Sequence, residues 1–197
     1  MSISPQRRQE ILDALRRGTV PQRSLDAFAV GLGRFEEAFN EGLDSVAAGG
    51  AVFKAVRGEY GSGKTFFARW LQERALSRGF AVAEVQVSET ETPLHRLETV
   101  YRRVVERLRT SDTPSGAWRS IVDGRFFALE QDVLAEGEID ENNIEVLNGQ
   151  VTLLMEKRLT SIKAQAPAFA AALRTYREAM LEGDVALADG LLSWVGG

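Results

Sequence analysis

The chain has 197 residues, a formal net charge of −4 and 44% hydrophobic residues. This length allows one substantial hydrophobic core, with room for a small appended region. Because the sequence contains no cysteine, it excludes a disulfide framework and a thiolate metal site. No signal core follows the N-terminus and no apolar run approaches the length of a membrane span, so we expect a cytoplasmic protein without a membrane partner.

The first part of the chain has the pattern of two helical regions. Ser4 as N-cap, Pro5 in the first turn and Gly18 after the last turn frame a helix, and its buried side is expected to hold Ile11, Leu12 and Leu15. A second helical region runs from about residue 25 to residue 47, with an interruption at Gly31 and Gly33.

The most specific motif follows a short apolar run at residues 51–56. It is the octet Gly58-Glu59-Tyr60-Gly61-Ser62-Gly63-Lys64-Thr65, which fits the phosphate-binding pattern G-x-x-x-x-G-K-[ST]. Its glycines allow a tight loop whose N–H groups face phosphate oxygens. Lys64 is expected to reach the β- and γ-phosphates and acts as the candidate catalytic residue, while Thr65 is the candidate Mg²⁺ ligand.

The neighbours of the octet fit a β-P-loop-α-β unit. Residues 51–56 are expected to form the first strand, residues 65–78 a helix and residues 80–87 a second strand. We therefore predict an α/β fold of the P-loop NTPase type with helical flanking and C-terminal regions. Phe66, directly after the octet, is a candidate for stacking on a base, although core packing is the alternative.

The rest of the chain has predominantly helical spacing. An amphipathic helix is predicted from Leu94 to Arg109, with its apolar stripe in the core. Residues 1–127 carry a net charge of +3 and residues 128–197 a net charge of −7. This asymmetry predicts two regions, 1–110 with the nucleotide-binding core and 111–197 acidic and mostly helical. After residue 116, helix breaks are expected at Gly124, Gly137, Gly149, Pro167, Gly183 and Gly190.

A second acidic motif, which P-loop ATPases need for Mg²⁺ and for the attacking water, has no clear copy. Glu89 and Glu156 each follow an apolar run, but the run before Glu156 has helical spacing. With only two predicted strands, the chain is interpreted as an incomplete fragment of a larger ATPase.

Residues 50–67 and 85–98 together closely resemble the BrxC/BrxD-type P-loop proteins of bacterial BREX phage-defence systems. The resemblance implies an AAA-like ATPase whose Walker B motif is missing here, and it maps phosphate binding onto Gly58, Gly61, Gly63, Lys64 and Thr65. Related AAA-like ATPases carry a V-G-R-x-x-E element near the adenine. Val30 and Gly31 look similar to its start and are candidate adenine contacts, but Arg34 is displaced by two residues.

The predicted function is ATP binding, with Mg²⁺, in an AAA-like ATPase of bacterial phage defence. Turnover is expected of the complete protein, whereas this chain lacks a clear second acid. Expected partners are other defence-system proteins, DNA through the complex, and a second copy of the chain as a homo-oligomer. Two alternatives stay open: a small-molecule or nucleotide kinase, and an interaction module that binds nucleotide without hydrolysing it.

Overall fold

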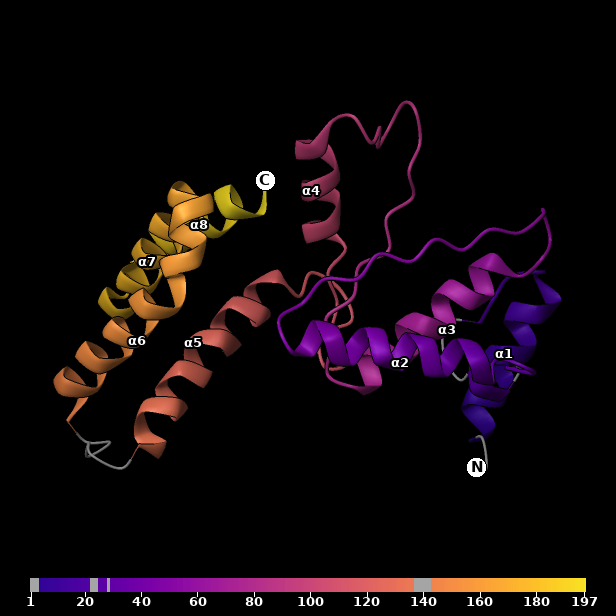
Figure 1. The fold of residues 1–197 in the computed structure, drawn as a ribbon, viewed down its shortest axis with the longest axis horizontal. Helices are drawn as coiled ribbons and strands as arrows, with labels where there is room; N and C mark the ends of the chain where they lie inside the picture. Colours follow the sequence, from indigo (N-terminus) through magenta and orange to yellow (C-terminus); the bar gives the residue numbers. More distant parts are fainter. Residues whose placement is uncertain (1–3, 22–24, 28, 137–142) are drawn as a thin grey trace. The chain divides into compact units, whose positions relative to one another are not determined.

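The computed structural model describes residues 4–21, 25–27, 29–136 and 143–197. Within these residues every regular element is a helix, and Figure 1 draws no strand. Contacts between residues divide the chain into two compact units, Met1–Val82 and Ala83–Gly197. The functional division into residues 1–110 and 111–197 stays a prediction.

The first unit contains helices α1 (Pro5–Arg16), η1 (Leu25–Ala27), α2 (Gly33–Ala47) and α3 (Lys64–Ser77), of which η1 is a 3-10 helix. Helix α1 begins as predicted, because the Ser4 hydroxyl accepts a hydrogen bond from the N–H of Arg7 and a proline occupies the first turn. Its buried residues are Ile11 and Ala14. Leu12 and Leu15, which we expected to be buried, are 41% and 50% exposed.

Helix α3 is fixed within the first unit through Trp70, whose side chain is 1% exposed. The indole Nε1 of Trp70 donates to the Asp26 carboxylate of η1 at 2.9 Å, and Arg74 contacts the same carboxylate oxygen at 3.0 Å. Arg74 also pairs with Glu36 of α2 at 2.6 Å and lies over the Trp70 ring. The loop that leads into α3 is therefore anchored at its C-terminal end.

The two predicted strands do not form. Residues 51–56 and 80–87 have no place in a sheet ladder, and the isolated antiparallel bridge that follows them joins Ser88 to Thr92. Val52, Phe53 and Val56 are 44%, 91% and 53% exposed. A β-prone run becomes a strand only where a neighbouring strand bonds its N–H and C=O groups over several residues. Within the described residues, the run at 51–56 contains no bridge residue and the run at 80–87 contains a single one, Val82. The predicted α/β P-loop core, AAA-like type included, is therefore wrong for this structure, which is helical in its described part.

The second unit contains α4 (Leu97–Glu106), α5 (Trp118–Ala135), α6 (Ile144–Gln165), α7 (Pro167–Glu182) and α8 (Val185–Gly196). Helix α4 is shorter than predicted at both ends. Its apolar stripe is only partly covered, because Leu97 is 76% exposed and Tyr101 is 42% exposed.

Some of the helix breaks predicted after residue 116 are present in the structure, and others are not. Pro167 begins α7 and Gly183, with φ of 76°, ends it. Gly124, Gly149 and Gly190 lie inside α5, α6 and α8, so the breaks predicted there are wrong. An isolated glycine weakens a helix by only about 1 kcal/mol, which packing between long helices overcomes. Gly137 lies outside the described residues.

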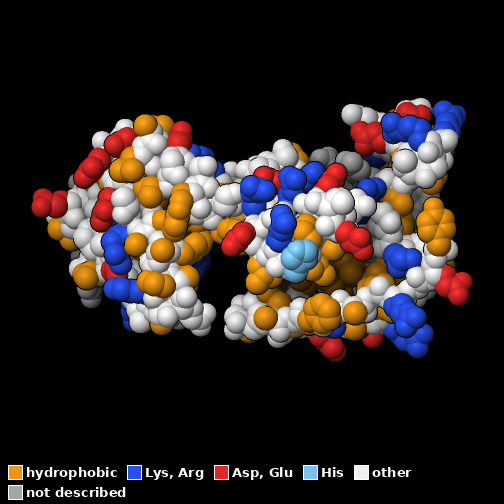
Figure 2. All heavy atoms as spheres, turned by 90° about the horizontal axis from the view of Figure 1, so that it is seen from above, with side chains coloured by type: hydrophobic (Ala, Val, Ile, Leu, Met, Phe, Trp, Pro, Cys, Tyr) orange, Lys and Arg blue, Asp and Glu red, His pale blue; other side chains and the backbone are white. Residues whose placement is uncertain are grey.

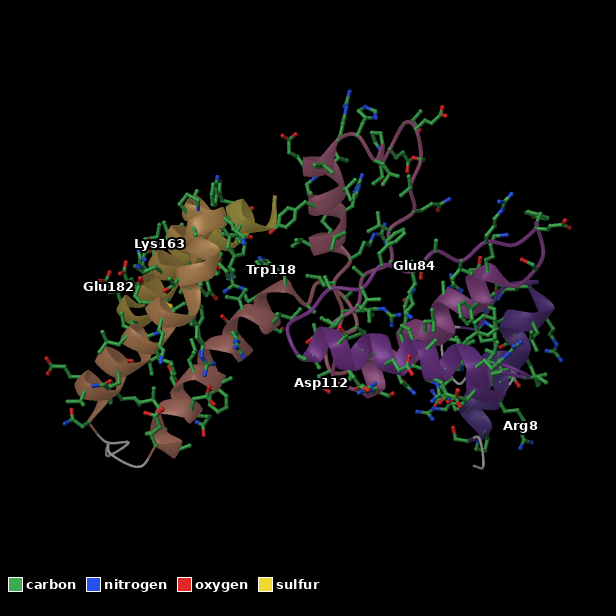
Figure 3. All side chains as sticks on the ribbon, in the orientation of Figure 1. Arg8, Glu84, Asp112, Trp118, Lys163 and Glu182 are labelled. Atoms are coloured by element: carbon green, nitrogen blue, oxygen red, sulfur yellow. The ribbon has the colours of Figure 1, made fainter. Side chains whose placement is uncertain are left out.

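Packing of α5 to α8 against one another forms the core of the second unit. Tyr176, 1% exposed, lies in a cluster with Val122, Ala179, Ala188 and Leu192. A second cluster joins α5 to α6 and comprises Leu129, Val133, Val151, Met155 and Leu159. At the start of α5, the indole of Trp118 donates to the carbonyl of Leu192 at 3.3 Å (Figure 3).

Polar groups inside this core are hydrogen-bonded. The Tyr176 hydroxyl donates to the Asp123 carboxylate at 2.5 Å. Arg177, 5% exposed, donates to the Thr152 hydroxyl and the Asn148 side-chain carbonyl at 2.8 and 3.3 Å. Burial lowers the pKa of Arg177 because it disfavours the charged form. The two neutral acceptors, Thr152 and Asn148, stabilise the buried guanidinium by hydrogen bonds.

The outer surface of the second unit retains apolar side chains. Figure 2 shows hydrophobic side chains on the face of α5 to α8, and Trp194 of α8 is 61% exposed. Despite this, no helix in the described ranges is both long enough and apolar enough to cross a bilayer.

Tyr176 predicts a specific dependence of stability on alkaline pH. Burial, followed by the hydrogen bond to Asp123 and the charge of that carboxylate, raises the Tyr176 pKa to about 12. An unfolded tyrosine titrates near 10, so the folded state favours the neutral phenol. This contribution is complete below pH of about 10 and disappears as the pH rises to about 12.

We therefore expect Tyr176→Phe to lower the free energy of unfolding by about 1 to 2 kcal/mol at pH 8, because a buried hydrogen bond is lost. The difference from the wild type should shrink between pH of about 10 and about 12. Urea unfolding at several pH values measures it. A difference that stays constant up to pH 12 would contradict the role given to the phenol.

Candidate phosphate-binding site

The glycine octet at residues 58–65 forms a tight loop between an extended segment and α3. Gly61 and Gly63 have φ of 81° and 87°, in the left-handed region that residues with a Cβ rarely adopt. Gly63 is the N-cap of α3, and the helix begins at Lys64. The two glycines therefore allow the chain to turn from the loop directly into the first turn of the helix.

The start and the middle of this loop lie very close together. A Cβ built on Gly58 would lie 2.5 Å from the hydroxyl oxygen of Ser62, a distance that no real side chain tolerates. The N–H of Ser62 donates to the carbonyl of Glu59 at 3.2 Å. A side chain at position 58 would therefore force the Ser62 hydroxyl to rotate away, whereas glycine lets the two residues approach without that change.

Several backbone N–H groups of the loop are left without a partner. Those of Gly61, Gly63, Lys64 and Thr65 donate to no acceptor within the described residues. The last two belong to the first turn of α3, where the helix dipole adds partial positive charge. Free N–H groups at a helix N-terminus are suited to an anion.

The ammonium group of Lys64 lies on the same loop. Its Nζ donates to the carbonyls of Gly58 and Glu59 at 2.9 and 2.7 Å. These are bonds to neutral acceptors, so the positive charge of Lys64 has no counter-ion in them. An anion at the loop would be attracted both by this charge and by the free N–H groups.

A cavity of about 1090 Å³ adjoins the loop. Its walls are mainly apolar and come from α2, from the extended segment before the loop and from α3, and they include Phe35, Phe39, Phe66 and Phe67. Phe35 and Phe67 meet edge to face, with their ring centroids 5.4 Å apart. The cavity can take a flat apolar group while an attached anion lies at the loop.

The structure brings most of the predicted site residues to this cavity. Its lining includes Val30, Gly58, Ser62, Gly63, Lys64 and Phe66. Gly31 follows Val30 and has φ of 74°. The other predicted residues, Glu59, Tyr60, Gly61 and Thr65, belong to the loop and the first helical turn but are outside the lining, and Tyr60 is fully exposed.

The cavity also reveals two cations that the sequence analysis did not single out. Lys54 and Arg57 line it from the extended segment. Their position in the run that leads directly into the glycine loop was the available signal. We instead interpreted that run only as an apolar strand.

The two candidate acids lie in the second unit. Glu89 is in the turn closed by the bridge between Ser88 and Thr92. Glu156 is on α6, as its helical spacing predicted, and pairs with Arg174 of α7, whose hydrogen bond is the main cause of the lowered pKa of Glu156. Within the described part of the chain, no aspartate or glutamate lines the cavity beside the loop. The described residues also hold no cluster of three or more potential metal ligands from His, Cys, Asp and Glu.

Free N–H groups, an uncompensated lysine and an adjoining apolar cavity define a candidate binding protein for phosphate-bearing ligands. Comparison with known proteins identifies the group to which it belongs. Residues 3–197 match the family model described as BREX system ATP-binding protein BrxC/D, and the chain therefore belongs to that family. No curated protein and no solved structure matches it.

The loop geometry predicts opposite effects for two glycine-to-alanine changes. Gly63→Ala forces a Cβ into a left-handed conformation and should lower the free energy of unfolding by about 1 kcal/mol or more. Gly124→Ala is the matched control, because Gly124 is inside α5 with nothing within 4 Å of a built Cβ. It should raise the free energy of unfolding by up to about 1 kcal/mol.

Urea unfolding followed by far-UV circular dichroism compares the two variants with the wild type. Stabilisation by both changes would show that position 63 does not need a left-handed residue. The left-handed turn into α3 would then be wrong.

Proposed function

We propose that the chain binds ATP with its triphosphate at the glycine loop. The observation that carries the proposal is the set of free N–H groups at the start of α3, next to the Lys64 ammonium. The family description, BREX system ATP-binding protein, names the same ligand. A nucleotide is thus a natural occupant of a cavity with an anion site at one end and aromatic walls beside it.

In this proposal, Lys64 exchanges its bonds to the carbonyls of Gly58 and Glu59 for oxygens of the β- and γ-phosphates. The free N–H groups of Gly61, Gly63, Lys64 and Thr65 hold the remaining oxygens. The exchange involves a single flexible side chain, so the loop glycines keep their conformation. Lys64 is also the group that would stabilise charge on a transferring phosphoryl group.

The adenine is assigned to the apolar part of the cavity. Val30, which lines it, and the adjacent Gly31 are the proposed contacts from the segment before α2. Phe66 lines the cavity from the first turn of α3 and offers an aromatic face. Glu59 and Tyr60 contribute backbone atoms of the loop.

The Thr65 hydroxyl is the proposed protein ligand for Mg²⁺. Thr65 is exposed in the first turn of α3, next to Lys64, and a hydroxyl oxygen there fits a hard cation that takes its other ligands from phosphate and water. Bound Mg²⁺ would neutralise phosphate charge. The protein's contribution is one oxygen at a fixed position.

Membership in the BREX family places the chain coarsely among defence-system proteins. We propose that other proteins of that system are its partners, that contact with DNA is made through the complex, and that the chain acts in the cytoplasm. Self-association as a homo-oligomer stays a prediction. A complete family member is proposed to hydrolyse ATP.

A second candidate function is a nucleotide-dependent interaction module without turnover. The observation that favours it is that no carboxylate belongs to the described residues that line the cavity. Water activation in P-loop hydrolysis needs such a group. In this alternative the bound nucleotide changes the contacts of the protein and is released unchanged.

Replacing Lys64 tests the binding proposal directly. Lys64→Ala should weaken ATP binding by about ten- to 100-fold, because a charged hydrogen-bond donor to phosphate is lost. Isothermal titration of ATP into the 197-residue chain measures the change. Lys157→Ala, which removes an exposed lysine on α6 of the second unit, is the control and should bind like the wild type. Equal affinity in all three proteins would refute the site.

Replacing Thr65 tests the metal assignment separately. Thr65→Ala should weaken ATP binding in the presence of Mg²⁺ and leave it unchanged in EDTA, because the lost hydroxyl is proposed to act only through the metal. The same titration in both buffers measures this. An equal loss in EDTA would assign the hydroxyl to the fold of the loop.

The chain alone should release phosphate at a rate near background. Loss of water activation typically costs about 10² to 10⁴ in rate, or about 3 to 5 kcal/mol of barrier. A phosphate-release assay with Lys64→Ala as the blank measures it. Turnover above about 1 s⁻¹ that Lys64→Ala abolishes would show that the chain contains an active acid.

A further inference from the structure

Among the residues that the structure describes, three cationic residues and no aspartate or glutamate line the cavity beside the glycine loop. Besides Lys64, the cations are Lys54 and Arg57 of the extended segment. Both are exposed, and neither has a hydrogen bond or an ion pair with another described residue. Their charges are therefore available to a ligand.

Lys54 and Arg57 both belong to the extended segment, and both line the cavity. Arg57 directly precedes Gly58, the first residue of the octet, and Lys54 lies three residues earlier. At about 3.3 Å per residue, the Cα atoms of residues 54 and 57 are about 10 Å apart. Arg57 is thus the cation next to the loop, and Lys54 is the one farther along the segment.

Contact with α2 keeps the Lys54 stem at the cavity. A Cβ built on Gly42 would lie 3.2 Å from Cε of Lys54 and 3.8 Å from Cγ1 of Val52. The lysine stem therefore passes over α2 at its small residue. This contact places the ammonium group beside the apolar wall, where its attraction for an anion is stronger than in open water.

The positive charges of Lys54, Arg57 and Lys64 repel one another when they lie close together. A bound anion would remove this repulsion and so stabilise the folded state. A single carboxylate would neutralise one of them. A polyphosphate chain carries several charges at short spacing and also suits the free N–H groups of the loop. In a nucleotide, the base attached to the polyphosphate would then lie against the aromatic walls of the cavity.

We propose that Lys54 and Arg57 extend the phosphate site, so that the protein distinguishes nucleotides by their number of phosphates. This inference rests on the proposed function of the loop. Lys64 and the loop N–H groups supply the binding common to all nucleotides. Lys54 and Arg57 supply the additional attraction that grows with the charge of the ligand.

The experiment measures the affinities of ATP, ADP and AMP by isothermal titration of the 197-residue chain in EDTA. The variants are Lys54→Gln and Arg57→Gln, singly and together. Arg8→Gln is the matched control, because Arg8 is an exposed arginine of the same unit on α1 (Figure 3). Lys64→Ala reports on the proposed function itself.

We expect the double variant to bind ATP about tenfold more weakly and AMP less than about twofold more weakly, with Arg8→Gln unchanged. Inorganic tripolyphosphate should displace ATP from the wild type and lose potency in the double variant by a similar factor. The salt dependence of ATP binding should become shallower, since two charged contacts are lost. Far-UV circular dichroism and the melting temperature verify folding, and Arg57→Lys, which keeps the charge, should retain most of the affinity.

The two hypotheses fail in different ways. If Lys64→Ala loses ATP while the double variant keeps the wild-type ratio of ATP to AMP affinity, the inference is wrong and the loop assignment stands. If the ratio is unchanged and tripolyphosphate does not compete, recognition depends on the base alone, which also overturns it. Absence of nucleotide binding in the wild type would overturn both.

Discussion

The geometry of the first unit depends on one contact, in which the buried indole of Trp70 donates to the exposed carboxylate of Asp26. A large aromatic ring is removed from water while its single N–H group keeps an acceptor. Arg74 shares that acceptor and reaches across to Glu36, so one cluster ties η1, α2 and α3 together. Because this cluster fixes α3 in the first unit, the N–H groups of its first turn are held in a defined position beside the glycine loop. The proposed anion site is thus supported from within the helix, about two turns away from the loop itself.

Charge divides the roles of the two units. Acids of the second unit are engaged in structure: Glu156 is paired with Arg174, Asp132 with Arg158, and Asp123 accepts from Tyr176. The described residues that line the cavity of the first unit include cations and no carboxylate. Such a surface attracts a phosphate chain and lacks a base for water. This distribution of charges favours binding of a nucleotide over its hydrolysis, because hydrolysis also needs a carboxylate that activates water.

Local features of the chain were predictable from the sequence, and pairing between distant segments was not. Ser4 and Pro5 mark the start of α1, Pro167 and Gly183 bound α7, and the glycine octet leads into α3. Each of these depends on the conformational preference of a few adjacent residues. The run at residues 51–56 has the preference of a strand, but a strand needs a partner whose position no local pattern specifies. Within the candidate site, the motif pointed to Lys64, whose role stays a prediction. It did not point to Lys54 or Arg57, because their proposed role arises from the cavity that α2 completes.

The exposed extended segment has a consequence for the behaviour of the protein in concentrated solution. Residues 51–56 combine high β-propensity with exposed apolar side chains and unpaired backbone groups, which is the combination that promotes edge-to-edge association between molecules. Lys54 interrupts this run at its centre with a charge. Two copies that aligned their segments would bring their lysines together in a setting that repels them. The same ammonium group that lines the cavity therefore acts as a gatekeeper against aggregation, and this position has a reason to stay charged even when no ligand is bound.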